Sequence, residues 1–112
     1  MRTKYHNRKT RLDGTLFDSK HEAERYWELK MLQKAGEISG LTTQMKFTLI
    51  PSQYIGKKLV ERPVTYIADF VYRDKDGNLV VEDAKSEATR TAAYILKRKL
   101  MLYLNKIRVI EV

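Results

Sequence analysis

The fold is decided by the stretch YIADFVYRDKDGNLVVEDAK, which runs from Tyr66 to Lys85. Both of its ends are rich in β-branched and aromatic residues, and its middle holds the Asp, Gly and Asn residues that favour turns. It predicts a β-hairpin with strands at 64–72 and 79–85 and a connecting turn at 74–78. The first strand carries Asp69, and the second carries Asp83, Ala84 and Lys85.

The length of the turn decides whether the two carboxylates meet. Side chains alternate between the faces of a strand, so a two-residue loop would pair Asp69 with Ala84 and separate the acids. A three-residue loop would pair Asp69 with Asp83 instead. The sequence favours this second register, because Asp74 suits the first position of a type I turn and Gly77 tolerates the left-handed conformation that follows.

In the favoured register, the hairpin presents a set of groups suited to metal chemistry. Asp69 and Asp83 offer hard oxygen ligands for Mg²⁺ or Mn²⁺, and the Ala84 carbonyl offers a third. Lys85 lies on the same face, where it would orient an attacking water or stabilise charge on a phosphate. The alternative is a surface hairpin whose acids are solvated or weakly paired. Acids embedded in apolar strands favour a functional role.

The distribution of charge predicts a polyanionic partner. The chain has 22 Lys and Arg against 14 Asp and Glu, for a formal net charge of +8. Half of the basic residues fall in two acid-free segments, namely Arg2, Lys4, Arg8, Lys9 and Arg11, then Arg90, Lys97, Arg98, Lys99, Lys106 and Arg108. Such clusters favour nucleic acid through the release of counterions. The alternative is that they serve solubility alone.

Composition predicts one folded domain inside a cell. A chain of 112 residues with 43% hydrophobic residues has room for a single core. It has no cysteine, and no long apolar run that would indicate a signal peptide or a membrane span. We therefore expect a single domain over 1–112, without a membrane, in the cytoplasm.

The remaining elements are predicted from periodicity and from helix-ending signals. We expect a basic, flexible arm at 1–12, a helix from about 18 to 36, a strand at 45–50, a loop or irregular strand at 53–62, a helix at 89–105 and a strand at 107–112. This order predicts a mixed α+β or α/β domain with a central sheet.

Four segments together resemble the PD-(D/E)XK nuclease superfamily and, within it, a small phage and prophage family of nuclease-like proteins. The segments are Phe17–Tyr26, Tyr66–Phe70, Val80–Lys85 and Tyr94–Lys99. The resemblance implies a restriction-endonuclease-like core, a four-stranded mixed sheet flanked by helices, and Mg²⁺-dependent cleavage of phosphodiester bonds. Ala68 stands where the superfamily name expects proline, and the adjacent acids Glu82 and Asp83 leave two candidates for the second ligand.

The resemblance also implies roles for residues on the two helices. Glu22 would complete the metal site with Asp69 and Asp83, although a capping box with Ser19 explains it equally in structural terms. Lys97 would approach the scissile phosphate, or else lie along the apolar edge of its helix. The further candidates are Arg98 and Lys99 for phosphate binding, and Gln44, expected just before a strand, for positioning water or substrate.

The residues predict a Mg²⁺- or Mn²⁺-dependent DNA endonuclease, and the resemblance implies a phage or prophage origin and hence the cytoplasm of a bacterial host cell. Branched recombination intermediates are the expected substrates, and a homodimer is expected because so small a domain has little surface to span a junction. One rival is a non-catalytic nucleic-acid-binding module of the same fold. Another is an interaction protein in phage assembly whose charge serves only solubility.

Overall fold

The centre of the protein is a four-stranded mixed sheet. The computed structural model describes residues 10–12, 15–17 and 19–112. The sheet has the order β3-β6-β7-β8, with bounds Ser39–Ile50, Val64–Arg73, Leu79–Asp83 and Ile110–Glu111. The first three strands are antiparallel, and β8 runs parallel to β7. The predicted mixed α+β domain with a four-stranded mixed sheet and two helices is therefore confirmed.

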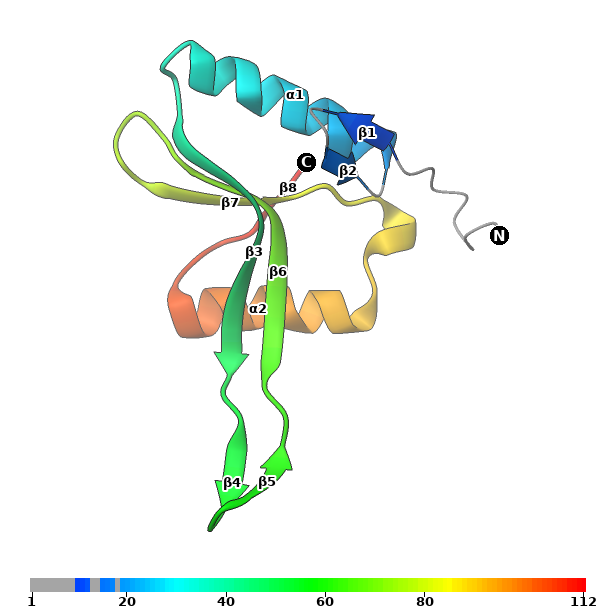
Figure 1. Cartoon of the computed structure of the whole chain (residues 1–112), viewed down its shortest axis with the longest axis vertical. Helices are drawn as coiled ribbons and strands as arrows, with labels where there is room; N and C mark the ends of the chain where they lie inside the picture. The colour runs from blue at the N-terminus through cyan, green and yellow to red at the C-terminus, as the bar shows by residue number, and fades with distance from the viewer. Residues whose placement is uncertain (1–9, 13–14, 18) are drawn as a thin grey trace.

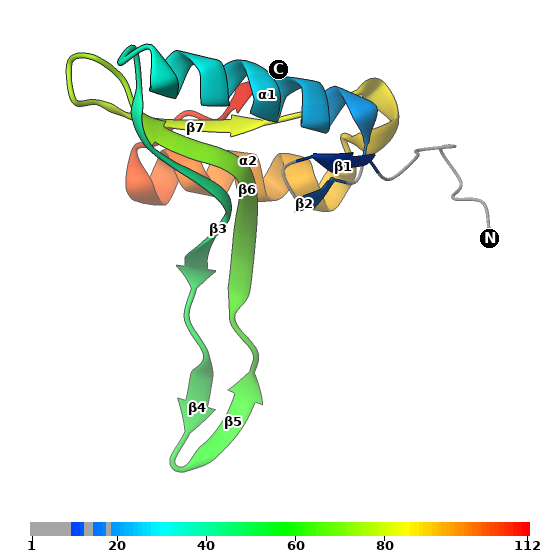
Figure 2. The same cartoon turned by 45° about the horizontal axis from the view of Figure 1, so that its top comes forward.

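The two helices bury opposite faces of this sheet, as Figure 2 shows around β7. They are α1 and α2, which span Lys20–Lys34 and Ala92–Asn105. Leu29 of α1 belongs to one core cluster with Phe70, whereas Met101 of α2 belongs to another with Val81. Phe70 and Val81 come from neighbouring strands and lie on opposite faces, so each helix covers a separate core.

The ends of the helices follow from capping. The Ser19 hydroxyl accepts a hydrogen bond from the Glu22 N–H at 3.1 Å, and Gly36, with φ +80°, follows the end of α1. Both ends of this helix agree with the prediction. The second helix begins later than predicted, because Thr91 is its N-cap and the preceding Glu87–Thr89 form a short 3₁₀ helix, η1.

The register of the β6–β7 hairpin is the one that the three-residue loop predicts. Arg73 pairs with Leu79, and the Asp74 N–H donates to the Asn78 carbonyl at 3.0 Å. Gly77 has φ +82°, the left-handed conformation expected of it. The same register continued by one residue beyond the Phe70–Glu82 pair sets Asp69 opposite Asp83.

Two further strand pairs lie outside the central sheet. The pair β4 and β5, Gln53–Ile55 and Lys58–Glu61, projects from the end of β3 and β6 as a two-stranded ribbon (Figure 1). Near the N-terminus, β1 pairs with β2, and these strands span Thr10–Leu12 and Thr15–Phe17. The predicted flexible arm thus ends in a paired strand, while residues 1–9 lie outside the described residues.

Strands β3 and β6 bend together where they leave the layered part of the sheet (Figures 1 and 2). Ala68 and Phe70 are two residues apart and would share a face in a regular strand. Here Ala68 belongs to the core under α2 and Phe70 to the core under α1, so the side-chain alternation of β6 changes at this point. Asp69 therefore lies where the strand passes from one core to the other.

Neither helix in the described part of the chain has the length and apolar character needed to cross a membrane.

Candidate active site

Each of the two hairpin carboxylates accepts a hydrogen bond from a backbone N–H on the other side of the hairpin. The Asp69 N–H donates to Asp83 Oδ1 at 2.9 Å, and the Ala84 N–H donates to Asp69 Oδ2 at 2.9 Å. These bonds take the place of the regular ladder at the end of β7. Asp83 is 1% exposed, whereas Asp69 is half-buried. The two acids are therefore fixed face to face, one of them in the core.

Asp83 is a buried acid that forms no ion pair with any described residue. The Tyr66 hydroxyl donates to its Oδ2, and burial, opposed by this hydrogen bond and supported by the charge of Asp69, raises the Asp83 pKa to about 6. Among the described residues, none forms an ion pair with either Asp69 or Asp83. A buried carboxylate beside a second carboxylate is unfavourable unless a positive charge joins them.

Glu22 and Asp69 are linked through Gln44. The Gln44 side-chain nitrogen lies 3.2 Å from Asp69 Oδ1 and 3.5 Å from Glu22 Oε1, and Glu22 is buried on α1. Gln44 lies inside β3, not before a strand as expected, and opposite Asp69. Its φ of +53° is rare for a residue with a side chain. Such strain tends to occur at functional sites.

The backbone strain at Gln44 can be measured with two variants that both remove its side-chain amide group. Gln44→Ala keeps the left-handed penalty of a residue with Cβ, whereas Gln44→Gly relieves it. We expect the glycine variant to be more stable than the alanine variant by about 1 kcal/mol in urea unfolding. Equal stabilities, or a less stable glycine variant, would show that the backbone here carries no strain.

Two predicted lysines meet Asp83 at one cavity. Lys85 and Lys97 line a cavity of about 290 Å³ with Asp83, Tyr66 and Tyr94. The Lys85 Nζ lies 4.4 Å from the centre of the Tyr94 ring, a cation–π contact that holds the ammonium group beside the acids. Helix α2 thus brings Lys97 to the same cavity as Asp83 and Lys85, and its contact with a scissile phosphate stays a prediction.

The acid next to Asp83 has a different role. Glu82 is buried on the opposite face, where Arg25 Nε and Nη2 donate to its two oxygens at 2.8 and 2.7 Å, and Tyr72 donates a further hydrogen bond. This bidentate pair neutralises Glu82 within the core under α1. Of the two candidates in the sequence, Asp83 is the acid that lies opposite Asp69.

The donor atoms suit a hard divalent cation. The Asp69 and Asp83 carboxylates are hard oxygen donors that face each other across the hairpin, and neither forms an ion pair with any described residue. The described residues contain no assembled group of three or more His, Asp or Glu side chains, since Glu22 is joined to Asp69 through the Gln44 amide. Of these acids, the two hairpin carboxylates lie closest together, whereas Glu22 is connected to Asp69 only through the Gln44 side chain.

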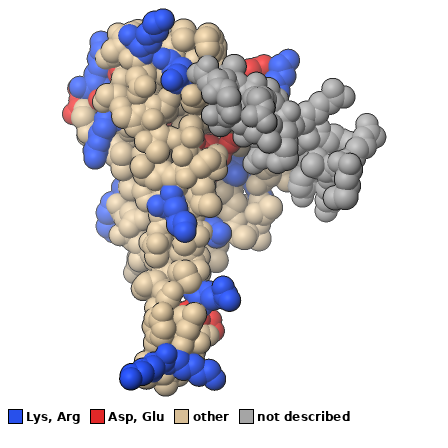
Figure 3. All heavy atoms as spheres, viewed as in Figure 1, with Lys and Arg blue, Asp and Glu red and all other residues tan. Residues whose placement is uncertain are grey.

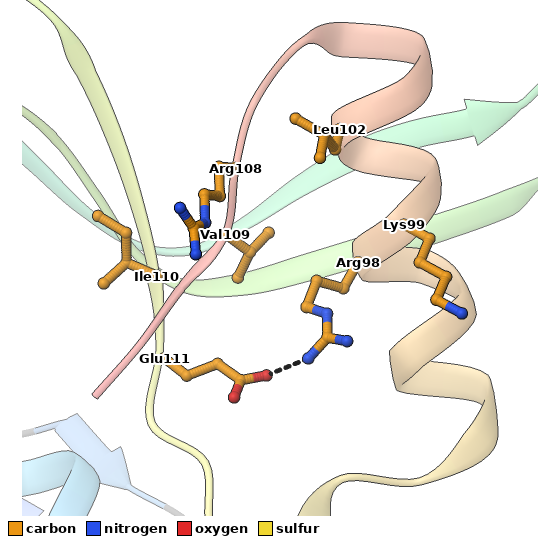
Figure 4. A pocket seen from close by; sticks show the side chains of 7 residues that line it. All are labelled: Arg98, Lys99, Leu102, Arg108, Val109, Ile110 and Glu111. Carbon is orange, nitrogen blue, oxygen red and sulfur yellow. Dashed lines mark hydrogen bonds and ion pairs between the residues drawn. The ribbon is translucent and has the colours of Figure 1, made fainter.

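Two of the predicted phosphate-binding residues belong to a second cavity. Arg98 and Lys99 line a space of about 740 Å³ with Arg108 and Glu111 (Figure 4). Arg98 Nη1 lies 2.9 Å from Glu111 Oε2. Burial raises the Glu111 pKa, but hydrogen bonds from Tyr94, Arg90 and Arg98 outweigh it and lower the pKa to about 2. Arg98 is therefore engaged by Glu111, which leaves Lys99 and Arg108 as the cations of this cavity without an ion pair among the described residues.

The basic residues of the N-terminal segment cannot be placed against the site. Arg2, Lys4, Arg8 and Lys9 lie outside the described residues. Arg11 belongs to β1, but its side chain is not among those described. Their predicted contact with nucleic acid stays a prediction.

The fold and the site define a mixed α+β protein with a carboxylate pair and two lysines at the bend of its central sheet. The family model described as a protein of unknown function, DUF1064, matches residues 2–110, and the chain belongs to this family. No curated protein and no solved structure matches the chain.

Proposed function

We propose that this protein is a metal-dependent endonuclease that cleaves phosphodiester bonds in DNA. The observation that carries the proposal is the pair of facing carboxylates, one buried and with no ion-pairing partner among the described residues, beside two lysines at a cavity. A stable protein would neutralise such a pair, as Arg25 neutralises Glu82. A cation and a substrate phosphate would together supply the missing partners.

The chain's residues would divide the chemistry as follows. Asp69, Asp83 and the Ala84 carbonyl would hold Mg²⁺ or Mn²⁺, which when bound supplies Lewis acidity toward the phosphate. Lys85, held against Tyr94, would orient the attacking water or stabilise the developing negative charge. Lys97 would bind the scissile phosphate from α2, and Glu22 would support the site through Gln44.

The proposal also covers the fold superfamily, the kind of substrate, the origin of the protein and its oligomeric state. The order of the sheet, with a hairpin that carries the acids and helices on both faces, is compatible with a restriction-endonuclease-like core and with the PD-(D/E)XK resemblance. The net charge of +8 supports a polyanionic substrate. A phage or prophage origin, a branched substrate and a homodimer extend the proposal beyond the site.

Cleavage of a panel of DNA shapes tests the proposal. Purified protein is incubated with labelled single-stranded, duplex, forked and four-way DNA in Mg²⁺ or Mn²⁺, with EDTA as control. We expect cleavage that EDTA abolishes and that Lys85→Ala reduces by about a hundredfold, the scale of losing one charge-stabilising donor. Metal-independent cleavage, or none with any substrate, would contradict the proposal.

The second candidate is a nucleic-acid-binding module without turnover. It is favoured by the ready-made bonds within the site, because each acid already accepts a backbone N–H. Binding that weakens steeply with salt, together with no cleavage under either metal, would establish this alternative. The phage assembly alternative predicts neither binding nor cleavage.

A further inference from the structure

We propose that the β4–β5 ribbon is a second nucleic-acid contact, which enters a groove of duplex DNA about one helical turn from the cleavage site. This inference rests on the proposed function and names a surface that the catalytic residues do not use. The ribbon leaves the body of the protein as a separate two-stranded sheet (Figure 1).

The ribbon has no role in either core. Every residue of β4 and β5 is exposed, including Tyr54 at 60% and Ile55 at 74%. The chain's two prolines, Pro51 and Pro63, stand at its root, where their missing N–H groups separate it from the central sheet. Apolar side chains held away from the core on an ordered hairpin indicate contact with another molecule.

The charge of the ribbon favours a polyanion as that molecule. Residues 51–63 carry Lys57, Lys58 and Arg62 against the single acid Glu61. The two lysines lie at the tip, because Ile55 pairs with Lys58 across a two-residue loop that Gly56 begins with φ +62°. Figure 3 shows the basic side chains gathered at this end of the molecule. A second copy docked tip to tip would bring four lysines together, which disfavours self-association there.

The dimensions of the ribbon match duplex DNA. The major groove, about 12 Å wide, admits a two-stranded β-ribbon. The 12 residues from Lys58 to Asp69 make 11 steps along the chain, which span at most about 36 Å at roughly 3.3 Å per step. Successive crossings of one groove are about 34–36 Å apart. A straight ribbon of this length, laid along the duplex with Asp69 at a scissile phosphate, would bring the tip to the neighbouring turn.

Binding to duplexes of increasing length tests this reach. The Asp83→Asn protein, which is expected to bind without cutting, is compared with the same protein carrying Lys57→Gln/Lys58→Gln. On duplexes of about three turns, we expect the ribbon change to weaken binding about tenfold and to reduce the salt slope by about 2. On duplexes of about one turn, the two proteins should bind alike.

A matched control and the oligomeric state decide whether the ribbon binds DNA, contributes only general charge, or binds a second copy of this chain. Lys34→Gln/Lys75→Gln removes the same charge from two exposed lysines away from the ribbon and should leave the length dependence unchanged. An equal loss in this control, or a ribbon variant that binds every length normally, would overturn the inference. So would a dimer that Ile55→Ser converts to a monomer, which would assign the ribbon to a second copy of this chain.

The proposed function and this inference can be tested separately. With saturating DNA, the Lys57→Gln/Lys58→Gln change in the wild-type background should leave the cleavage rate intact, because the lysines lie far from Asp83. If the wild-type protein cleaves but the ribbon change has no effect on binding, only the inference is wrong. If the wild-type protein neither binds nor cleaves, both are wrong.

Discussion

Asp83→Asn is expected to abolish cleavage and, at the same time, to make the protein more stable at neutral pH. Loss of a metal ligand removes several kcal/mol of transition-state stabilisation, or about a thousandfold in rate. Stability should rise because the asparagine is neutral where the wild-type carboxylate is buried and faces Asp69. Its Oδ1 can still accept from the Asp69 N–H, and its Nδ2 can donate to the Tyr66 hydroxyl.

The sign of the pH dependence follows from the raised Asp83 pKa. The folded protein keeps the proton up to the raised Asp83 pKa of about 6, whereas the unfolded chain loses it near the ordinary aspartate pKa of 3.8. Stability from this group is therefore complete below pH 4 and is lost as pH rises through 6. The advantage of Asp83→Asn in free energy of unfolding should grow between pH 4 and pH 7 by on the order of 1–3 kcal/mol.

Urea unfolding at several pH values checks this result. Asp76→Asn makes the same chemical change at an exposed position in the turn of the same hairpin, and should alter neither stability nor cleavage. Mg²⁺ at about a hundred times its dissociation constant should stabilise the wild-type protein by about 2.7 kcal/mol and should stabilise Asp83→Asn much less. A folded Asp83→Asn protein that cuts DNA normally would contradict the assignment of this acid.

The sequence predicted best what depends on neighbouring residues. Asp74 and Gly77 decide the turn, the turn decides the register, and the register brings Asp69 to Asp83, so the candidate site was accessible from a few residues. The first helix was likewise predictable from the Ser19 cap and Gly36. Local chemistry of this kind leaves a clear trace in the sequence.

Other features depend on contacts that the sequence does not reveal. Arg25 and Glu82 are 57 residues apart, and no spacing rule joins a helix to a strand at that distance. The positive φ of Gln44 occurs at a residue type that gives no warning of it. The ribbon was ambiguous because its strands bury nothing, and without a buried face the alternation that marks a strand is lost.

Arg25→Met is expected to cause the largest loss of stability of any change proposed. Glu82 is 2% exposed, and without the arginine its charge would keep only the hydrogen bond from Tyr72. Removing one partner of a buried pair typically costs about 3–5 kcal/mol, a large share of the 5–15 kcal/mol that stabilises a domain. The midpoint of thermal unfolding should fall by more than about 10 °C.

A double-mutant cycle separates the buried charge from lost packing. Arg25→Met/Glu82→Gln should recover most of the stability, because the neutral amide no longer requires a cation. Glu28→Gln removes the exposed partner of the same arginine and should have little effect. If Arg25→Met loses less than about 1 kcal/mol, or the double variant recovers nothing, Glu82 is not the buried charge that the geometry indicates.

The same variants decide which of the two adjacent acids serves catalysis. The Arg25→Met/Glu82→Gln protein, assayed well below its unfolding temperature, should cleave DNA at nearly the wild-type rate, because Glu82 lies on the face of the sheet opposite the Asp83 cavity. Asp83→Asn should do the reverse, gaining stability and losing cleavage. A folded double variant without activity would transfer the catalytic role to Glu82. With both outcomes as expected, the acid paired with Arg25 stabilises the fold, and the acid that forms no ion pair among the described residues binds the metal.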